Sequence, residues 1–326
     1  MMKLWQKAKK HINRFRHIDY SVLEKVVLSQ AELQQLRNWA QENNLNNQPS
    51  PTRVRQSYGE QESHNLGHGL EFEHSRVYRA GDEKKHINWR LSARMQELHV
   101  KQFNEFQQRR VYILLDTLPN MRFGTRRRTK IAQALRAALY IAHSAKIRHC
   151  QVFAIVVDAS RGNTMLQSDY DGIEDYLNRA YPPQPHYTAA QSAAFWQEHL
   201  AANKAGNHLV IAISDFQFVP ELNASEWRQF NQLLQSSTAI AVQIYDPIEK
   251  ALPKSGIFNL SPPGGGDTLD FDMSNRALHE NFSRTTTEFY QLMKERLRLT
   301  FLDTIAVQTD EERIDGKLHQ PLISYL

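Results

Sequence analysis

Short apolar segments alternate along this chain with segments whose apolar residues recur at helical spacing. The run from Val111 to Leu115 is continuously apolar and ends at Asp116, as a buried parallel strand ends at a loop. The same pattern predicts strands at 151–157, 208–213, 238–244 and 301–307, and helices at 129–146, 171–180, 189–202, 224–235 and 275–297. Strands that alternate with helices form βαβ units with helices on both faces of a parallel sheet. The sequence therefore predicts an α/β fold with a doubly wound, mostly parallel sheet.

Segments of other character flank this pattern and give the predicted domain organisation. Ser29, followed by Glu32, is typical of the start of a helix, here expected to run to about Gln41 before an Asn-rich linker at 43–51. Residues 53–108 are polar with short alternations, which favours strands and turns. A Gly- and Pro-rich hairpin is expected at 256–272. The predicted parts are a helical segment with linker (1–50), a β-rich segment (51–108), the α/β domain (109–310) and a C-terminal tail (311–326).

Residues 3–16 form a basic amphipathic pattern. Leu4, Trp5, Ala8, Ile12 and Phe15 fall on one helical stripe, with Lys and Arg largely around the remainder. This stripe either docks on an anionic membrane surface or an acidic partner, or packs on the body of the protein itself.

Composition and charge exclude several classes of protein. The 326 residues are 41% hydrophobic and 23% charged, and no apolar run approaches the roughly 20 residues of a membrane span. Charges interrupt the first ten residues too often for a secretory signal, and the single cysteine, Cys150, allows no intramolecular disulfide. The histidines at 64, 68, 74, 86 and 99 match no standard zinc spacing. A cytoplasmic protein is expected, with a peripheral position at the inner membrane if residues 3–16 bind lipid.

Two carboxylates follow predicted strands. Asp116 closes one strand and Asp215 follows the strand at 208–213. Ligands of open α/β sheets bind beyond the carboxyl ends of the strands, and Mg²⁺ needs only one or two protein carboxylates. If the strands are neighbours, these carboxylates meet at one edge and could bind Mg²⁺; otherwise Asp116 caps the loop that follows it.

This edge resembles the metal-ion-dependent adhesion site of von Willebrand factor A-like domains, which uses Asp-x-Ser-x-Ser, a Thr from a second loop and a later Asp. The matching positions are Asp116, Leu118, Asn120, Thr188 and Asp215. Leu118 cannot bind a metal, and Asn120 offers an amide oxygen in place of a hydroxyl. The resemblance therefore implies a degenerate site of Asp116, Asn120, Thr188 and Asp215, with no cofactor or with weakly bound Mg²⁺.

A longer set of motifs resembles the domain-of-unknown-function family fifty-eight, a branch of von Willebrand A-like proteins. The motifs are Phe123-Gly124, Ser214-Asp215-Phe216, Asp246-Pro247-Ile248-Glu249 and a signature segment within 69–94. The signature residues are Gly69, Glu71, Phe72, Arg76, Tyr78, Gly81, Asp82, Trp89, Arg90 and Arg94. Their charges alternate with apolar residues, so they are expected to form ion pairs over a half-buried surface, with direct contact to a partner through Trp89 and the arginines as the alternative.

A basic loop follows Asp116. It contains Arg122, Arg126, Arg127, Arg128 and Lys130, directly before a predicted helix. Positive charge at a helix N-terminus opposes the helix dipole. The loop is therefore expected to receive a carboxylate or phosphate from a partner, unless it is simply a solvated turn.

The resemblance implies the function. Family members are associated with MoxR-type AAA+ ATPases in maturing or remodelling protein complexes. The expectation is a non-enzymatic adaptor that presents the Asp116 edge and the basic loop to such an ATPase and its client, in keeping with the absence of a complete catalytic set. The alternatives are a Mg²⁺-dependent phosphohydrolase that uses Asp116 and Asp215, and a generic polyanion or nucleic-acid binder.

Overall fold

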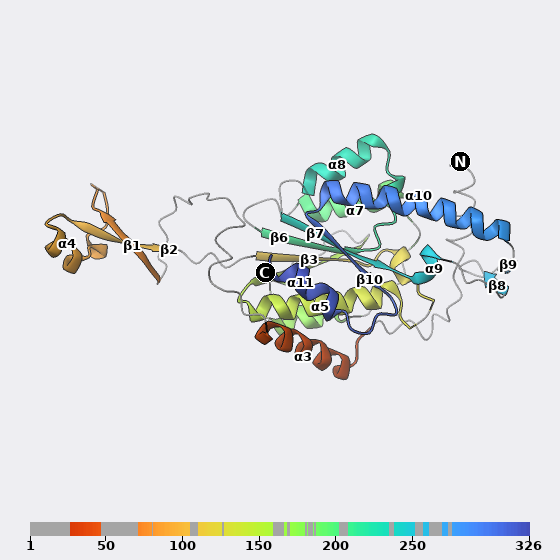
Figure 1. Cartoon of the computed structure of the whole chain (residues 1–326), viewed down its shortest axis with the longest axis horizontal. Helices are drawn as coiled ribbons and strands as arrows, with labels where there is room; N and C mark the ends of the chain where they lie inside the picture. Colours follow the sequence, from red (N-terminus) through yellow and green to blue (C-terminus); the bar gives the residue numbers. More distant parts are fainter. Residues whose placement is uncertain are drawn as a thin grey trace. The chain divides into compact units, whose positions relative to one another are not determined.

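The chain divides into two units, which are described separately (Figure 1). Unit 1 comprises residues 1–48 and 109–326, and unit 2 comprises residues 49–108. The computed structural model describes residues 27–46, 71–79, 81–104, 110–125, 127–158, 166–167, 170–179, 181, 185, 187–201, 208–234, 238–251, 257–260, 269–272 and 276–326. The predicted boundary between residues 108 and 109 coincides with the division between the units.

A six-stranded sheet with the order β10-β7-β6-β3-β4-β5 forms the centre of unit 1. Five strands are parallel, and the two-residue β5, which the sequence did not predict, pairs antiparallel with β4. The strands are β3 (Arg110–Asp116), β4 (Gln151–Val157), β5 (Leu166–Gln167), β6 (His208–Ser214), β7 (Thr238–Tyr245) and β10 (Asp303–Gln308). The predicted doubly wound α/β fold is confirmed.

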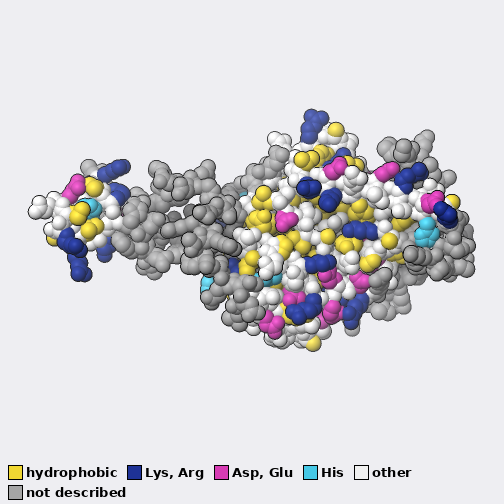
Figure 2. All heavy atoms as spheres, viewed as in Figure 1, with side chains coloured by type: hydrophobic (Ala, Val, Ile, Leu, Met, Phe, Trp, Pro, Cys, Tyr) yellow, Lys and Arg dark blue, Asp and Glu magenta, His cyan; other side chains and the backbone are white. Residues whose placement is uncertain are grey.

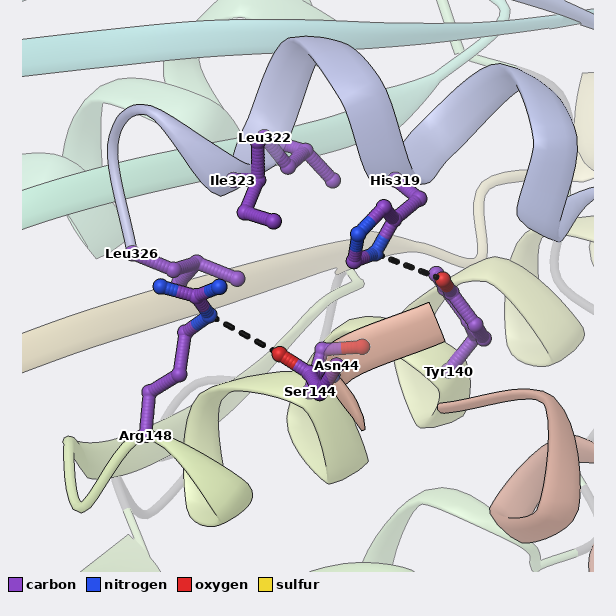
Figure 3. A pocket seen from close by; sticks show the side chains of 8 residues that line it. All are labelled: Asn44, Tyr140, Ser144, Arg148, His319, Leu322, Ile323 and Leu326. Atoms are coloured by element: carbon purple, nitrogen blue, oxygen red, sulfur yellow. Dashed lines mark hydrogen bonds between the residues drawn. The ribbon is translucent and has the colours of Figure 1, made fainter. Parts of the chain in front are cut away.

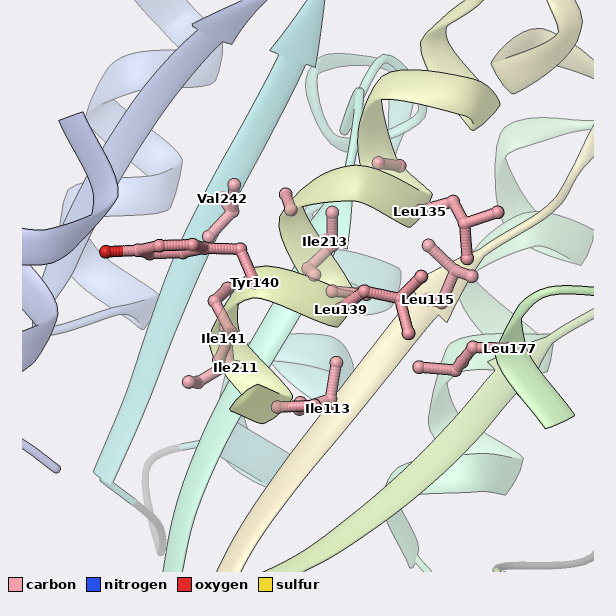
Figure 4. Close-up of a cluster of buried hydrophobic side chains, with 14 of the residues drawn as sticks. Ile113, Leu115, Leu135, Leu139, Tyr140, Ile141, Leu177, Ile211, Ile213 and Val242 are labelled. Carbon is pink, nitrogen blue, oxygen red and sulfur yellow. The ribbon is translucent and has the colours of Figure 1, made fainter. Parts of the chain in front are cut away.

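Helices cover both faces of the sheet because the central strands are apolar on both sides (Figure 1). Ile113 and Leu115 of β3 point into one core cluster, whereas Tyr112 and Leu114 point into the other. The first cluster contains residues of α3 (Gln30–Asn46), α5 (Lys130–Ile147), α6 (Tyr170–Leu177) and α11 (Asp315–Ile323); the second contains residues of α7 (Ala189–Ala201), α8 (Ala224–Leu234) and α10 (Arg276–Thr300). Figure 4 shows α5 packed against the first face.

The first described helix is longer than predicted and belongs to unit 1. The capping box at its start is present, with Glu32 N 3.3 Å from Ser29 Oγ and Ser29 N 3.1 Å from Glu32 Oε2. The helix continues to Asn46, so the predicted linker at 43–51 begins too early. Leu33 and Leu36 are buried in the core that α5 lines, which explains why α3 is no separate segment.

The expected C-terminal tail is also part of the core. Residues 315–323 form α11, and Ile314, Leu318 and Leu322 are buried against the first face of the sheet. These three residues are four apart and therefore share one helical face. The prediction of a separate tail at 311–326 is wrong because this apolar stripe packs on α3 and α5.

Unit 2 contains an antiparallel pair, β1 (Glu71–Val77) and β2 (His99–Asn104), with η1 (Lys84–His86) and α4 (Trp89–Met95) between them. The strands agree with the β-rich prediction, but α4 does not. Its start is fixed by Asn88, whose Oδ1 accepts from Leu91 N at 3.2 Å. Arg, Leu, Ala and Met are good helix formers, so this capped segment becomes a short helix.

The remaining described elements are short. They are η2 (Pro119–Arg122), η3 (Val219–Glu221), α9 (Pro247–Lys250) and the hairpin strands β8 (Ile257–Leu260) and β9 (Leu269–Asp272). The strand pair confirms the predicted hairpin, whose tip lies outside the described residues. So do residues 3–16, and with them the predicted amphipathic helix. Within the described part of the chain no helix is long and apolar enough to cross a membrane.

Candidate functional site

Asp116 and Asp215 lie at the same edge of the sheet, as the sequence predicts for neighbouring strands. β3 pairs with β6 in parallel, with Leu115 opposite Ile213. Asp116 Oδ2 accepts from Ser214 Oγ at 2.5 Å, and Asp116 Oδ1 accepts from Leu118 N at 2.8 Å. The bond to Leu118 is the loop-capping role considered for Asp116, so this carboxylate holds the start of the loop whether or not it binds anything else.

The environment of Asp116 favours its protonated form. The residue is 1% exposed. Burial raises the pKa of Asp116 to about 7, and the negative charge of Asp215 acts in the same direction. The hydrogen bonds from Ser214 and Leu118 oppose this shift because they stabilise the carboxylate.

Lys130 supplies the positive charge at this edge. It is the first residue of α5, and its Nζ lies 2.6 Å from Asp215 Oδ2 and 2.6 Å from Glu249 Oε1. The side chain is 1% exposed, and Nζ also lies 5.7 Å from the centre of the Phe123 ring. The two carboxylates raise the pKa of Lys130 although burial alone would lower it, so the ammonium stays charged. The prediction that Lys130 contacts an external anion is wrong, because two internal carboxylates already bind it.

Asp246 joins the basic loop to two other loops. Its two carboxylate oxygens accept from Thr125 N at 2.8 Å, Thr125 Oγ1 at 2.6 Å and Thr309 Oγ1 at 2.8 Å. Asp246 is fully buried and also caps α9, where Glu249 Oε2 accepts from Asp246 N at 3.0 Å. Glu249 thus caps α9 with one oxygen and binds Lys130 with the other. The capping box of α9 therefore fixes the positions of the Asp246 and Glu249 carboxylates.

The loop between Asp116 and α5 folds tightly on itself. Lys130 N donates to Phe123 O at 2.7 Å. A Cβ on Gly124 would lie 2.2 Å from the carbonyl oxygen of Arg128, closer than any real Cβ contact. Glycine is therefore required at this position. The backbone at Gly124 passes close to the backbone at Arg128, and this tight turn places Lys130 next to the loop.

The other two residues of the predicted metal site do not join the carboxylates. Thr188 is exposed and caps α7, its Oγ1 accepting from Gln191 N at 3.2 Å, and it forms no hydrogen bond to Asp116 or Asp215. Asn120 lies in η2, where its carbonyl accepts from Phe123 N. Asp215 as a metal ligand would first have to part from Lys130. The described residues contain no group of three or more His, Cys, Asp or Glu side chains arranged to hold a metal ion.

The basic loop has an acidic counterpart within the chain, contrary to expectation. Glu312 forms ion pairs with Arg127 and with Arg128, the latter at 3.5 Å. Arg122 donates through Nη2 to the carbonyl of Tyr181. Arg126 lies outside the described residues. The prediction failed because Glu312 lies about 185 residues away, between β10 and α11, in the segment expected to be a tail.

The signature segment divides into residues that build unit 2 and residues that face solvent. Arg76 and Asp82 form a bidentate ion pair, with both N–O distances 2.8 Å, which confirms part of the predicted pairing. Gly81 has φ +112°, a conformation that favours glycine. The backbones of Glu71 and Phe72 belong to β1, Tyr78 N donates to Leu98 O, and Gly69 lies outside the described residues.

Trp89, Arg90 and Arg94 differ from the rest of the signature segment. Trp89 is 67% exposed, and both arginines are exposed. Neither arginine has an ion pair with any residue that the structure describes. Their predicted role in ion pairs is therefore wrong, and the alternative, contact with a partner, is the one compatible with their exposure.

A small pocket lies between α3, α5 and α11, away from the sheet edge (Figure 3). It has room for about one water molecule and is lined by Asn44, Tyr140, Ser144, Arg148, His319, Leu322, Ile323 and Leu326. Arg148 Nε donates to Asn44 Oδ1 at 2.9 Å, and Tyr140 Oη lies 3.3 Å from His319 Nδ1. Burial raises the pKa of Tyr140 to about 12 and lowers that of His319, so both side chains stay neutral at pH 7. The Tyr140–His319 pair joins α5 to α11, and the Arg148–Asn44 hydrogen bond joins the end of α5 to α3.

Sequence reasoning missed Ser214, Glu249 and Thr125 as parts of the edge. Asp246 and Glu249 were noticed only as a family motif, although Asp-Pro-x-Glu is also the local pattern of a capped helix start. That pattern could have predicted the α9 capping box. It could not have predicted that Lys130, which precedes Glu249 by 119 residues, completes the network.

Unit 1 is a doubly wound α/β domain whose carboxylate edge is neutralised by an internal lysine, and unit 2 is inserted into its sequence. The model of the family described as "Protein of unknown function DUF58" matches residues 74–290, and the chain belongs to this family. Uncharacterised proteins of Mycobacterium tuberculosis (Rv1480) and Mycobacterium bovis (Mb1516) are each 21% identical over 249 residues, which cover 76% of this chain and 77% of theirs.

Two solved structures resemble the chain at 12% identity each. One is the conserved hypothetical protein BatB from Bacteroides thetaiotaomicron, with a TM-score of 0.38 over 67% of this chain and 96% of that chain. The other is an aerotolerance-related membrane protein from Bacteroides fragilis, with a TM-score of 0.33 over 57% of this chain and 99% of that one.

Proposed function

We propose that this protein is a non-enzymatic interaction adaptor, a partner of a MoxR-type AAA+ ATPase in the assembly or remodelling of protein complexes. The observation that carries the proposal is the position of Lys130 between Asp215 and Glu249. Ligands of doubly wound sheets bind beyond the carboxyl ends of the strands. Here the ammonium group of Lys130 occupies that place, so we expect partners to bind to the outer surface of the protein.

A hydrolytic role has less support. A phosphohydrolase that uses Asp116 and Asp215 needs both carboxylates within reach of a substrate or a metal. Asp116 is 1% exposed and Asp215 is 3% exposed, and each is already hydrogen-bonded inside the protein. A general base must contact the proton it removes, so these two carboxylates are poorly placed for catalysis.

Generic polyanion binding also has less support. Arg127 and Arg128 share the carboxylate of Glu312, which lowers the positive potential of the basic loop. The proposed location of the adaptor is the cytoplasm, with a peripheral membrane position if residues 3–16 bind lipid.

The test combines binding and turnover on the full chain. Biolayer interferometry with the MoxR-type ATPase of the same organism, in ADP and in a non-hydrolysable ATP analogue, is expected to show saturable binding. Hydrolysis of p-nitrophenyl phosphate with Mg²⁺ or Mn²⁺ is expected to stay at the level of the buffer. Turnover that disappears in Asp116→Asn would overturn the proposal in favour of an enzyme, and absence of ATPase binding in both nucleotide states would overturn the partner.

A further inference from the structure

The outward face of α4 in unit 2 is formed by Trp89, Arg90, Ala93 and Arg94. All four side chains are exposed. The opposite side of the helix is fixed by Ser92, which is buried and whose Oγ accepts from His99 N at 2.9 Å. Residues three and four apart share a helical face, so Trp89 lies beside Ala93 and Arg90 lies beside Arg94. An apolar strip and a cationic strip therefore run side by side on one small surface.

Trp89 supplies the apolar part of this surface, and unit 2 exposes other large apolar side chains as well. Trp89 is 67% exposed and Met95, at the end of α4, is 60% exposed. Leu98 and Val77, on the adjoining strand ends, are 44% and 43% exposed. Figure 2 shows hydrophobic, basic and acidic side chains near one another on the visible side of the unit. An exposed tryptophan beside arginines is typical of protein interaction sites.

The charge within α4 itself has one sign, and the exposed Glu97 follows the end of the helix. α4 contains no acidic residue, and Arg90 and Arg94 are four apart, so the two guanidinium groups repel each other. The ion pairs that the described part of unit 2 forms use Arg76 with Asp82, and Lys85 and His86 with Glu83. Within the described residues neither Arg90 nor Arg94 forms an ion pair.

A surface on α10 has similarly exposed apolar and basic side chains, so exposure alone does not distinguish the α4 face. Lys294 and Arg298 are an exposed pair four apart, and Leu299 is 68% exposed. Glu295 lies within the same helical turn and makes the charge there mixed. α4 has no acid inside the helix, since Glu97 follows only after the left-handed Gln96 has ended it, and this difference makes the α10 face a control.

We propose that the outward face of α4 docks an acidic segment of a partner protein. Carboxylates of that segment pair with Arg90 and Arg94, whose planar guanidinium groups bind carboxylates through two parallel hydrogen bonds, and an apolar side chain packs on Trp89. Trp and Arg are the residue types that dominate interface energetics, which favours a protein over a lipid surface. The inference rests on the proposed function and specifies its surface and the chemistry of the partner.

The experiment measures fluorescence anisotropy of a labelled peptide in which Glu and Asp alternate with Leu and Phe, titrated with the full chain. The reference peptide has Gln and Asn in place of the acids. The wild type is expected to bind the acidic peptide at least about 10-fold more tightly than the reference peptide, and more weakly as salt increases. Trp89→Ala and Arg90→Glu/Arg94→Glu are each expected to weaken binding by at least about 10-fold.

Matched controls come from α10. Leu299→Ala removes an equally exposed apolar side chain, and Lys294→Glu/Arg298→Glu makes the same charge reversal at the same spacing; both are expected to leave binding unchanged. Far-ultraviolet circular dichroism of all variants checks that they are folded. Equal binding of the two peptides, or equal losses in the α4 and α10 variants, would overturn the inference.

Two further arms separate other outcomes. Vesicles of phosphatidylcholine with phosphatidylserine replace the peptide in one arm, and if only the vesicles bind through Trp89, Arg90 and Arg94, the occupant is a membrane and the inference is wrong. Binding of the MoxR-type ATPase is measured with the same variants. ATPase binding that persists in the α4 variants refutes the docking surface and leaves the adaptor role intact, whereas its absence in the wild type refutes the adaptor role.

Discussion

Lys130→Met removes a buried positive charge that faces two buried carboxylates. Lys130 Nζ lies 2.6 Å from an oxygen of Asp215 and 2.6 Å from an oxygen of Glu249, and the three side chains are 1%, 4% and 8% exposed. Removing one partner of a buried pair costs about 3–5 kcal/mol, because it leaves an uncompensated charge in a medium of low polarity. At about 2 °C per kcal/mol for a domain of this size, Tm should fall by about 6–10 °C.

The size of this loss should depend on pH. The pKa of Lys130 is raised, so its contribution is complete below the ordinary lysine pKa and is lost only as pH rises through the folded-state value. In the variant, the unpaired carboxylate of Glu249, whose pKa burial raises, can lose its charge by binding a proton. The difference between wild type and variant is therefore expected to be smaller at pH 5 than at pH 8.

Urea unfolding followed by tryptophan fluorescence, at both pH values, measures the effect. Lys294→Met, at an exposed position on α10, should change the stability by less than about 0.5 kcal/mol. The combination Lys130→Met/Asp215→Asn/Glu249→Gln should recover most of the loss, because it leaves neither carboxylate buried without its cation. A single variant that loses less than about 1 kcal/mol, or a combination no more stable than the single variant, would refute the role of Lys130 as the internal cation.

Three other substitutions test the edge and its surroundings. Burial raises the pKa of Asp116 to about 7, so its ionisation should lower the free energy of unfolding as pH rises from about 4 to about 7, on the order of a few kcal/mol. Asp116→Asn should flatten this part of the stability–pH curve. A curve that the substitution leaves unchanged contradicts the raised pKa. Gly124→Ala should cost about 1–3 kcal/mol by urea unfolding because its Cβ would meet Arg128 O, whereas Gly316→Ala, with no atom within 4 Å, should cost less. Thr188→Ala should cost about 0.5–1 kcal/mol through the lost α7 cap, and a stabilising effect of Mg²⁺ that disappears in this variant would instead support a metal site.

The strands and long helices were predictable because each follows one simple periodicity. The predicted strand at 151–157 coincides with β4, and the other predicted parallel strands differ from the observed ones by at most two residues at either end. α11 could have been predicted too, since Ile314, Leu318 and Leu322 are spaced at four residues. Pro321, which lies inside that helix, weakened the helical signal. α4 has only seven residues, too few to show a period, and depends on the Asn88 cap.

Lys130 shows which features of a site can be predicted from local sequence and which cannot. A cation at the first position of a helix is electrostatically unfavourable, and the sequence correctly indicated that this charge needs a carboxylate. The source was misassigned to a partner because Asp215 and Glu249 lie 85 and 119 residues away. The pairing of β3 with β6 brings Asp215 to Nζ of Lys130, and the α9 cap after β7 brings Glu249 there. Sequence therefore shows that a charge needs a partner, whereas the fold decides which residue provides it.

Arg90 and Arg94 now pose the same question with the fold known. In the described residues around α4, Asp82 and Glu83 are already paired, and the exposed Glu97, which follows the helix, forms no ion pair with either arginine. Because neither arginine forms an ion pair with a described residue, the acidic segment that we propose would supply their carboxylates. The edge at Lys130 therefore needs no external anion, because Asp215 and Glu249 bind its ammonium group. For the α4 face, an external acidic segment stays our proposal.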